Sequence, residues 1–329
     1  MSRPDSGVKK CRSEGSDMTF KNICIFGGSG FVGKHLANLL TNREIYLRIP
    51  TRNYERAKEL LEIPTTDLIE ADIYDDRDLD RLLLGIDAVI NLVGVLQGDF
   101  HAVHVELPQK IIAACKRNGI TRILHMSALK AGPGQPSEYL RSKGEGEQIV
   151  RTSGMDATVF RPSVIFGPGD SSINLFARLG RLPVLPLASP HAKFQPIFVM
   201  DVVQAFALSL DEPRTFGRSY DLCGPKCYSL RELVEYAAHV TGHDPAIIGL
   251  GDALSHLEAA VMEILPGKLM SVDNYYSMKI DSVCDCDSPE ALLEVWGIPP
   301  TALEEAAPIY LKHQLPRERY NYLRHWSGR

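Results

Sequence analysis

Three glycines spaced three residues apart mark the first candidate site. Gly27, Gly30 and Gly33 follow the apolar segment Ile23–Phe26 and lead into an amphipathic helical stretch. A glycine at the first position permits a tight turn, one at the second lets the backbone approach a pyrophosphate, and one at the third lets helix and strand pack closely. The amides at the helix N-terminus would donate to the phosphates. The loop therefore predicts dinucleotide binding.

The same loop has two alternative interpretations. Residues 28–34 read GSGFVGK, one residue short of the phosphate-binding loop of an NTPase. Such a loop needs Ser or Thr after its lysine to hold Mg²⁺, whereas His35 follows Lys34 here. The other alternative is a merely structural glycine turn. Dinucleotide binding is favoured over both, because the glycines stand directly after a strand and at the head of a helix.

The end of the second expected strand favours NADP(H) over NAD(H). An NAD site normally places a carboxylate about 20 residues past the glycines, where it accepts from the ribose 2′-hydroxyl. No Asp or Glu occurs between Ile45 and Tyr54, and Thr51 and Arg52 stand there instead. Because a guanidinium suits a 2′-phosphate, Arg52 is a candidate ligand for it. The alternative is an ordinary surface arginine.

A tyrosine and a lysine four residues apart form a second candidate site. Tyr139 and Lys143 begin the helix expected after the fifth strand, and their spacing puts both on one helix face. A phenol with a pKa near ~10 is a poor acid–base group at neutral pH unless a nearby ammonium stabilises its phenolate. Two other Tyr–Lys pairs in the chain share this spacing but not this position.

With its GxxGxxG loop and its YxxxK helix, the chain resembles the extended short-chain dehydrogenase/reductase family, which includes NAD-dependent epimerases and dehydratases. Within that family it is most similar to the branch of the short-chain-dehydrogenase-like accessory subunit of respiratory complex I and its bacterial relatives. The segments that carry this similarity are VHVELPQKIIAA, SALKA, SEYLRSKGEGE, RPSVIFGPGD, FQPIFVMDVV and GIPPTALEEAAPIYL. The resemblance implies that NADPH is held while the protein stabilises or helps assemble a larger complex.

The resemblance also implies a role for each matched position. The implied cofactor contacts are Gly27, Ser29, Gly30, Phe31 and Gly33 at the pyrophosphate, Arg52 at the 2′-phosphate, Asp72 and Ile73 at the adenine, Val93 and Gly94 under the cofactor, Lys143 at the nicotinamide ribose, and Pro162 near the carboxamide. The implied catalytic set is Tyr139, Lys143 and Ser127, with Ser127 holding a substrate carbonyl or hydroxyl. No metal site is expected.

Departures from the enzyme pattern leave three functions open. The position where active family members often carry Asn holds His104, and Pro108 disturbs the same turn, which weakens a proton relay. Ser127 lies only twelve residues before Tyr139, without the loop common in sugar-nucleotide epimerases. An NADPH-holding accessory or assembly protein of respiratory complex I is favoured. The alternatives are an active NADP-dependent reductase and a sugar-nucleotide epimerase or dehydratase.

These sites require a parallel sheet to position them. Short apolar runs alternate with amphipathic stretches, which predicts an α/β fold with a Rossmann-type doubly wound parallel sheet. The expected strands are Ile23–Phe26, Ile45–Ile49, Leu68–Ala71, Ala88–Val93, Arg122–Met126 and Ala157–Phe160. The expected organisation is a disordered tail over residues 1–20, an NADP(H)-binding domain over 21–162, and a smaller, interrupted second lobe over 163–329, interleaved with the last sheet elements.

Local signals predict three further features of the second lobe. Ser229 with Glu232 fits a capping box ahead of a helix, and Ser288 followed by Pro289 fits another helix start. Asp201 is expected to cap a helix over residues 202–210 rather than to act in catalysis. The stretch 315–329 shows no strong periodicity.

Composition excludes several classes of protein. The 36 basic and 41 acidic side chains leave a net charge of −5, which does not suggest nucleic acid as a partner. The seven scattered cysteines indicate free thiols in a reducing compartment rather than a disulfide framework or a metal site. No run approaches the ~20 apolar residues of a membrane span, and residues 1–20 lack a secretion signal. We therefore expect a cytoplasmic protein. The resemblance implies respiratory complex I subunits as partners, and with them a peripheral location on the cytoplasmic or mitochondrial matrix face of the inner membrane.

Overall fold

The structure is a computed structural model that describes residues 20–41, 43, 45–264, 270–284 and 290–312. The expected disordered tail lies outside these ranges except for Phe20. The helix start at Ser288 and Pro289 and the stretch 315–329 also lie outside them.

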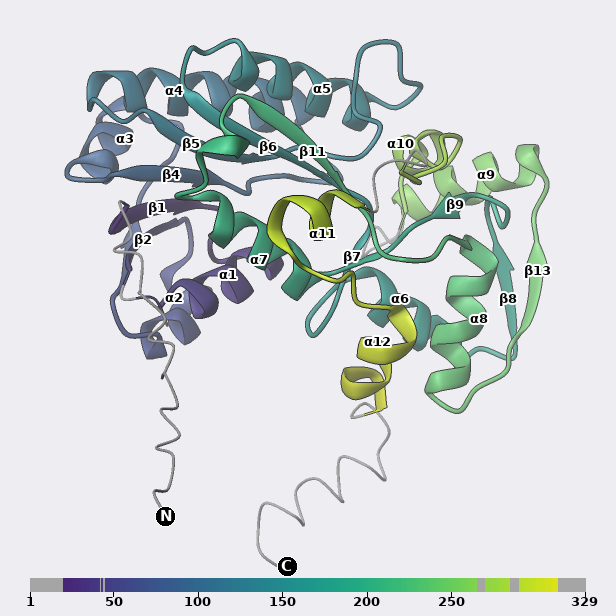
Figure 1. Cartoon of the computed structure of the whole chain (residues 1–329). Coiled ribbons are helices and arrows are strands. Elements are labelled where there is room, and N and C mark those ends of the chain that lie inside the picture. Colours follow the sequence, from purple (N-terminus) through teal and green to yellow (C-terminus); the bar gives the residue numbers. More distant parts are fainter. Residues whose placement is uncertain (1–19, 42, 44, 265–269, 285–289, 313–329) are drawn as a thin grey trace, which may run out of the picture.

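A seven-stranded parallel sheet forms the centre of the molecule (Figure 1). Its strands lie in the order β3–β2–β1–β4–β5–β6–β11, and every neighbouring pair is parallel. The strands are β1 Asn22–Phe26, β2 Tyr46–Thr51, β3 Thr66–Glu70, β4 Ala88–Asn91, β5 Arg122–Met126, β6 Asp156–Pro162 and β11 Arg218–Leu222. The predicted doubly wound sheet is confirmed. The edge strand β11 was not predicted, because only Leu222 of its five residues is buried and its sequence shows no apolar run.

Helices cover both faces of the sheet because successive strand residues point to opposite faces. Ile23 and Ile25 belong to one hydrophobic core, whereas Cys24 and Phe26 belong to the other. The helices that contribute to the first core are α1 Phe31–Thr41, α2 Tyr54–Ala57, α7 Val199–Ser209 and α11 Glu290–Trp296. Those that contribute to the second are α3 Asp76–Leu83, α4 Leu107–Arg117 and α5 Glu138–Arg151. Burial on both faces explains the continuous apolar runs of β1 and β4.

Within the described residues, three small sheets and five helices lie outside the central sheet and the helices that cover it (Figure 1), and we refer to them as the second lobe. Its paired strands are β7 Ile165–Phe166 with β10 Ile197–Phe198, β9 Lys193–Phe194 with β12 Tyr228–Ser229, and β8 Val184–Leu187 with β13 Ala246–Gly249. Its helices are α6 Ser172–Leu179, α8 Leu230–Val240, α9 Asp252–Ile264, α10 Val272–Ser277 and α12 Leu303–Leu311. The predicted capping box of α8 is confirmed, since Ser229 Oγ accepts from Glu232 N–H while the Glu232 carboxylate accepts from Ser229 N–H.

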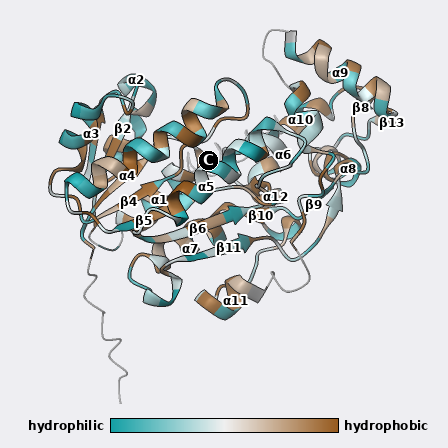
Figure 2. Ribbon diagram, turned by 90° about the horizontal axis from the view of Figure 1, so that it is seen from above, coloured by the Kyte–Doolittle hydropathy of each residue, from teal (hydrophilic) through white to brown (hydrophobic). Residues whose placement is uncertain are grey.

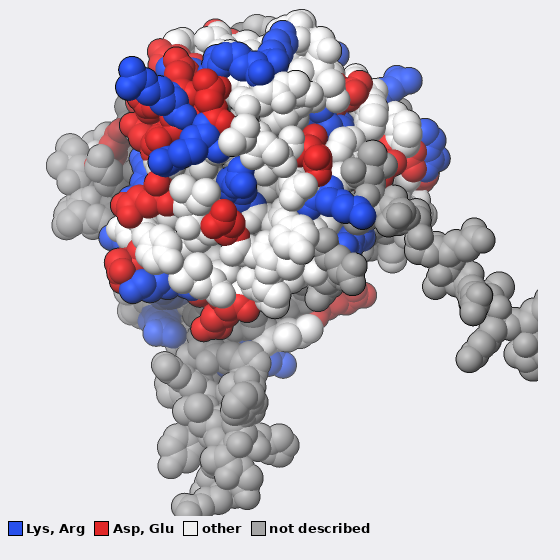
Figure 3. All heavy atoms as spheres, turned by 90° about the vertical axis from the view of Figure 1, so that its left-hand side faces the viewer, with Lys and Arg blue, Asp and Glu red and all other residues white. Residues whose placement is uncertain are grey.

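The side of the molecule that carries α2 and α3 has a mixed charge (Figure 3). Basic and acidic side chains alternate over this face, and several of them are paired. Arg117 lies 2.9 Å from Asp80, and Arg81 lies 3.2 Å from Asp78. Such exposed pairs contribute little to stability, and among the described residues on this side the alternation leaves no continuous basic surface.

The predicted role of Asp201 is wrong. Helix α7 begins at Val199 rather than at residue 202, so Asp201 lies inside its first turn and Phe198 occupies the N-cap position. The Asp201 carboxylate instead accepts hydrogen bonds from Thr301 N–H (2.7 Å) and Thr301 Oγ1 (3.0 Å). Asp201 therefore ties the segment that precedes α12 to the central fold.

The expectation that all cysteines are free thiols is also wrong. Cys223 and Cys284, 61 residues apart, form a disulfide, while Cys24, Cys115 and Cys227 are free. Cys223 directly follows β11, and the bond packs against Leu129 at the same end of the sheet. The spacing of cysteines along the chain could not reveal this pair, because only the fold brings the two segments together.

Candidate functional site

The predicted site residues of the sheet all lie at the carboxyl ends of its strands. Their positions are Gly27, Ser29, Gly30, Phe31 and Gly33 from the end of β1 into α1, Arg52 directly after β2, Asp72 and Ile73 after β3, Val93 and Gly94 after β4, Ser127 directly after β5, and Pro162 at the end of β6. In an open α/β sheet this edge is where ligands bind. The fourth strand ends at Asn91, earlier than predicted, because the Asn91 side chain accepts from Val93 N–H (3.1 Å) and turns the chain.

The glycine loop is tight where the sequence predicted it to be tight. Gly27 has a φ of 79°, and a Cβ there would lie 3.0 Å from the backbone of Val93. A Cβ at Gly33 would lie 2.5 Å from the backbone of Gly27 and Gly28, so only glycine fits between helix and strand. Gly30 is exposed, and a Cβ there would meet only the Gly27 oxygen, at 3.2 Å. The backbone at Gly30 is therefore open to a ligand, which fits a pyrophosphate.

Arg52 stands exposed at the end of β2 and makes no hydrogen bond or ion pair within the described ranges. It lies near Tyr74, whose pKa burial raises and the Arg52 charge lowers. Arg52 and the Asp72–Tyr74 segment thus lie close together at one corner of the sheet, where the strands β2 and β3 end, as the predicted adenosine site requires. The neighbouring strand β3 also brings the exposed carboxylate of Glu70 to this corner, in register with Thr51.

Lys143 joins the ends of two strands. Its Nζ donates to the carbonyl oxygens of Met126 (3.1 Å) and Val93 (3.4 Å). A Cβ at Gly94 would lie 2.9 Å from this Nζ, so a larger residue there would displace the amine from its present position. Burial lowers the pKa of Lys143 to about 8. The amine therefore lies under the backbone at Val93 and Gly94, where the nicotinamide end of the cofactor is predicted.

Tyr139 is held as a protonated phenol. Burial raises its pKa to about 12, and its ring packs edge-on against His104 and Phe100, with centroid separations of 5.6 and 6.1 Å. The expected ammonium neighbour, Lys143, donates to two carbonyl oxygens. The side chains of this chain thus favour the neutral phenol, which can donate a hydrogen bond but is a poor base at neutral pH.

Ser127 offers an unused hydroxyl in the same region. The residue is 3% exposed, and its Oγ has no hydrogen-bond partner within the described ranges. A buried polar atom without a partner is costly unless a ligand or water supplies one. Ser127 therefore fits a residue that donates to, or accepts from, a bound molecule.

Two contacts at this site were not predicted. Asp273 of α10 accepts from the N–H groups of Glu138 and Tyr139 and so caps α5 from the second lobe. His125, buried beside the site, accepts at Nδ1 from the Asn91 side chain (3.2 Å). Asp273 lies 134 residues from Tyr139 in the chain and has no local signal. The buried pair Asn91 and His125 could have been suspected from polar residues inside apolar strands.

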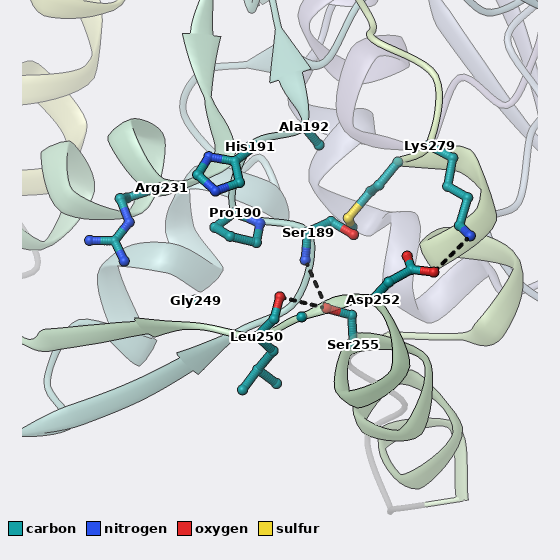
Figure 4. Close-up of a pocket in the computed structure, with 12 residues that line it drawn as sticks. Ser189, Pro190, His191, Ala192, Arg231, Gly249, Leu250, Asp252, Ser255 and Lys279 are labelled. Atoms are coloured by element: carbon teal, nitrogen blue, oxygen red, sulfur yellow. Dashed lines mark hydrogen bonds and ion pairs between the residues drawn. The ribbon is translucent and has the colours of Figure 1, made fainter.

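A cavity of about 600 Å³ lies in the second lobe, apart from this edge (Figure 4). It lies between the β8–β9 loop, the β13–α9 connection and the end of α10. Figure 4 shows Arg231 and Lys279 on opposite sides of it, with Lys279 directed toward Asp252. None of the predicted site residues lines this cavity.

Comparison with known proteins is consistent with this arrangement. A family model described as NAD(P)H-binding matches residues 27–176. A solved structure of an NADPH-dependent quinone oxidoreductase from Escherichia coli, complexed with NADPH, superposes with a TM-score of 0.71 at 20% identity. The match covers 88% of this chain and 99% of that one.

Two curated relatives resemble the chain more closely in sequence. The mitochondrial NADH dehydrogenase [ubiquinone] 1 alpha subcomplex subunit 9 of Rattus norvegicus is 32% identical over 227 residues, which is 66% of this chain and 60% of that protein. The chain thus spans about three fifths of the length of this relative. A ceramide reductase of Caulobacter vibrioides is 29% identical over 240 residues, which is 70% of this chain and 74% of that protein.

Proposed function

Because the chain belongs to the NAD(P)H-binding extended short-chain dehydrogenase/reductase family, of the epimerase/dehydratase type, we propose that it holds NADP(H) structurally as an accessory or assembly factor of respiratory complex I. The observation that carries this proposal is that two carbonyl oxygens engage the Lys143 amine while the Tyr139 ring packs against His104 and Phe100. A phenol with a pKa of about 12 beside an amine engaged by two carbonyl oxygens suits cofactor positioning better than proton abstraction.

The proposed cofactor contacts follow the carboxyl edge of the sheet. The open backbone at Gly30 and the N-terminus of α1 would hold the pyrophosphate. Arg52, free of any ion pair in the described ranges, would hold the 2′-phosphate and thereby select NADP(H) over NAD(H). Lys143 would contact the nicotinamide ribose. The reduced cofactor can supply a hydride when a substrate is present, and a structural role leaves that hydride unused.

Helix α9 supports the partner role. Leu254, Leu257 and Val261 are 56%, 57% and 50% exposed, and their spacing of three and four residues places them on one helix stripe. Figure 2 places this helix at the outer end of the second lobe, with hydrophobic residues along it. Contiguous exposed apolar residues typically mark a protein–protein contact. We propose that a subunit of the respiratory complex covers this stripe, as the relationship to a complex I subunit favours.

The proposed location follows from that partner. No helix in the described ranges is long and apolar enough to cross a membrane. We propose that association with complex I holds the protein on the cytoplasmic or mitochondrial matrix face of the inner membrane.

The test is a deletion strain complemented with variants, with membrane NADH oxidation, bound nucleotide and co-purifying proteins as readouts. Tyr139→Phe should retain NADPH, complex I association and activity, because only the packed ring is needed. Lys143→Ala should lose cofactor. Leu257→Asp should weaken association while retaining cofactor, whereas Leu84→Asp, exposed on the opposite lobe at 71%, serves as the matched control. If Tyr139→Phe binds both cofactor and complex yet fails to complement, catalysis replaces the structural role.

A catalytically active NADP-dependent reductase is the second candidate. Two observations favour it: the relationship to a ceramide reductase, and the buried Ser127 hydroxyl, which has no hydrogen-bond partner within the described ranges. In that case Ser127 would hold a substrate carbonyl while Tyr139 donates the proton. Purified protein should then oxidise NADPH with a carbonyl substrate, and Tyr139→Phe should slow turnover roughly 10²- to 10⁴-fold. No specific observation favours the third alternative, a sugar-nucleotide epimerase or dehydratase.

A further inference from the structure

We propose that His104 is a positioning residue: a single imidazole tautomer, protonated at Nδ1, clamps the loop after β4 to helix α5 and so holds the backbone over which the cofactor lies. The cofactor part of this inference rests on the proposed function. His104 belongs to a π-helical turn, Ala102–Glu106, that leads into α4.

The hydrogen bonds around the ring determine its tautomer. Val95 N–H donates to His104 Nε2 over 3.2 Å, so Nε2 must carry its lone pair. Ser142 Oγ donates its only hydrogen to the Tyr139 carbonyl oxygen (3.0 Å). The 2.9 Å contact between His104 Nδ1 and Ser142 Oγ therefore needs a hydrogen on Nδ1. Both ring nitrogens are engaged, and a doubly protonated ring would lose the Val95 bond.

The surroundings keep this ring neutral. His104 is 2% exposed, and the groups that face it are Tyr139 and Lys143 of α5 and, from β5, His125. Burial and the Lys143 charge lower the pKa of His104 to about 3. The clamp is therefore intact throughout the physiological pH range.

The π-helical turn packs directly against the backbone of α5. A Cβ at Gly146 of α5 would collide with the His104 carbonyl oxygen, so the turn lies directly against the helix backbone. The position of a Cβ at Gly94 would lie 3.8 Å from His104 Nε2 and 2.9 Å from Lys143 Nζ. His104 thus holds Val95, the neighbour of the exposed Gly94, and Ser142, the neighbour of Lys143 in α5.

Two conservative substitutions separate the two arms of the clamp. The Gln side chain reaches about as far as Nε2, so His104→Gln can still accept from Val95 N–H. The Asn side chain reaches only as far as Nδ1, so His104→Asn retains only the Ser142 arm. If the hydrogen bond from Val95 positions the loop over which the cofactor lies, His104→Gln should retain NADP(H) affinity and His104→Asn should not.

The first experiment is ¹⁵N NMR of the wild-type imidazole, with no added nucleotide. We expect a hydrogen on Nδ1, a lone pair on Nε2, and no titration between pH 5 and 8. A ring with a hydrogen on Nε2, or one that titrates with an ordinary histidine pKa, would overturn the clamp. Since this measurement needs no cofactor, it stands even if the protein binds no NADP(H), an outcome that would defeat only the proposed function.

The second experiment measures NADP(H) affinity by calorimetry. Loss of one buried hydrogen bond corresponds to roughly a tenfold change in affinity, so His104→Asn and His104→Ala should bind about tenfold more weakly. His104→Gln should stay close to wild type, as should the control His239→Gln, an exposed residue of α8. Equal weakening in the Gln and Ala variants, with wild-type binding intact, would overturn the positioning role.

Discussion

The carboxylate of Asp273 accepts a hydrogen bond from the backbone N–H of Tyr139 over 3.1 Å. The same carboxylate accepts from Glu138 N–H over 2.6 Å, while the N-cap residue Ser137 accepts from Leu140 N–H. The first turn of α5 is thus capped partly by its own sequence and partly by a helix of the second lobe. The orientation of Tyr139 therefore depends on how the two lobes pack.

Replacing Asp273 should destabilise the fold measurably. Asp273→Ala removes an acceptor from two N–H groups at a helix N-terminus and should lower the free energy of unfolding by about 1–2 kcal/mol. Urea unfolding would measure it, with Asp244→Ala as the control because Asp244 is exposed and has no hydrogen bond in the described ranges. Equal stability of the two variants would contradict the capping role.

Arg52→Asp should reverse cofactor preference. An aspartate at the end of β2 would accept from a ribose 2′-hydroxyl and repel a 2′-phosphate, so NADP(H) affinity should fall about 10- to 100-fold while NAD(H) binding improves. Calorimetry with both nucleotides measures this, with Arg56→Asp, an exposed neighbour on α2, as the control. Wild-type protein that binds NAD(H) as tightly as NADP(H) would show that Arg52 does not select the cofactor.

Substitutions at Gly33 and Gly30 should affect different properties, the first stability and the second nucleotide binding. Gly33→Ala places a Cβ 2.5 Å from backbone atoms and should lower the free energy of unfolding by about 1–3 kcal/mol. In Gly30→Val the Cβ would meet only the Gly27 oxygen, at 3.2 Å, so this variant should fold normally while blocking the nucleotide. Thermal unfolding and nucleotide binding of both variants separate the two effects. Normal nucleotide retention in Gly30→Val would mean that this loop does not meet the pyrophosphate.

Buried Lys143 should make stability depend on alkaline pH. Burial lowers its pKa from 10.5 to about 8. Between these values the unfolded chain binds a proton at Lys143 that the folded chain does not, so the free energy of unfolding rises with pH. The cost of burying the charge is fully present below pH 8 and is relieved toward pH 10.5.

Lys143→Met removes this titration. The free energy of unfolding of the wild type minus that of the variant should therefore increase by on the order of 3 kcal/mol between pH 8 and pH 10.5. Urea unfolding at both pH values measures it, and exposed Lys116→Met serves as the control. A difference that stays constant with pH would mean that Lys143 is charged in the fold at an ordinary pKa.

Reduction of the Cys223–Cys284 disulfide should destabilise the protein. A bond that closes a loop of this length typically contributes about 2–4 kcal/mol. Dithiothreitol should lower the denaturation midpoint of the wild type and leave Cys223→Ser unaffected, whereas Cys227→Ser should behave as wild type. Peptide mapping without reduction would identify the pair. Free thiols at both positions in oxidising buffer would contradict the bond.

The sequence by itself determined the features that consecutive residues encode. The apolar runs predicted six strands of the sheet, and the glycine spacing predicted the turn at Gly27 and the close packing at Gly33, because each depends on residues within one turn or one strand. The position of Arg52 and the absence of a carboxylate beside it are also local facts. They required only that the second strand end there.

Only the tertiary structure decided which distant segments meet. Strand β11, the Cys223–Cys284 pair, the cap that Asp273 places on Tyr139 and the two partners of His104 all join segments brought together by the fold. Asp201 is a further example, because the local sequence predicted a helix cap there, whereas the fold uses its carboxylate to accept a hydrogen bond from Thr301. Local patterns cannot specify these pairings, because each depends on how helices and strands pack after they form.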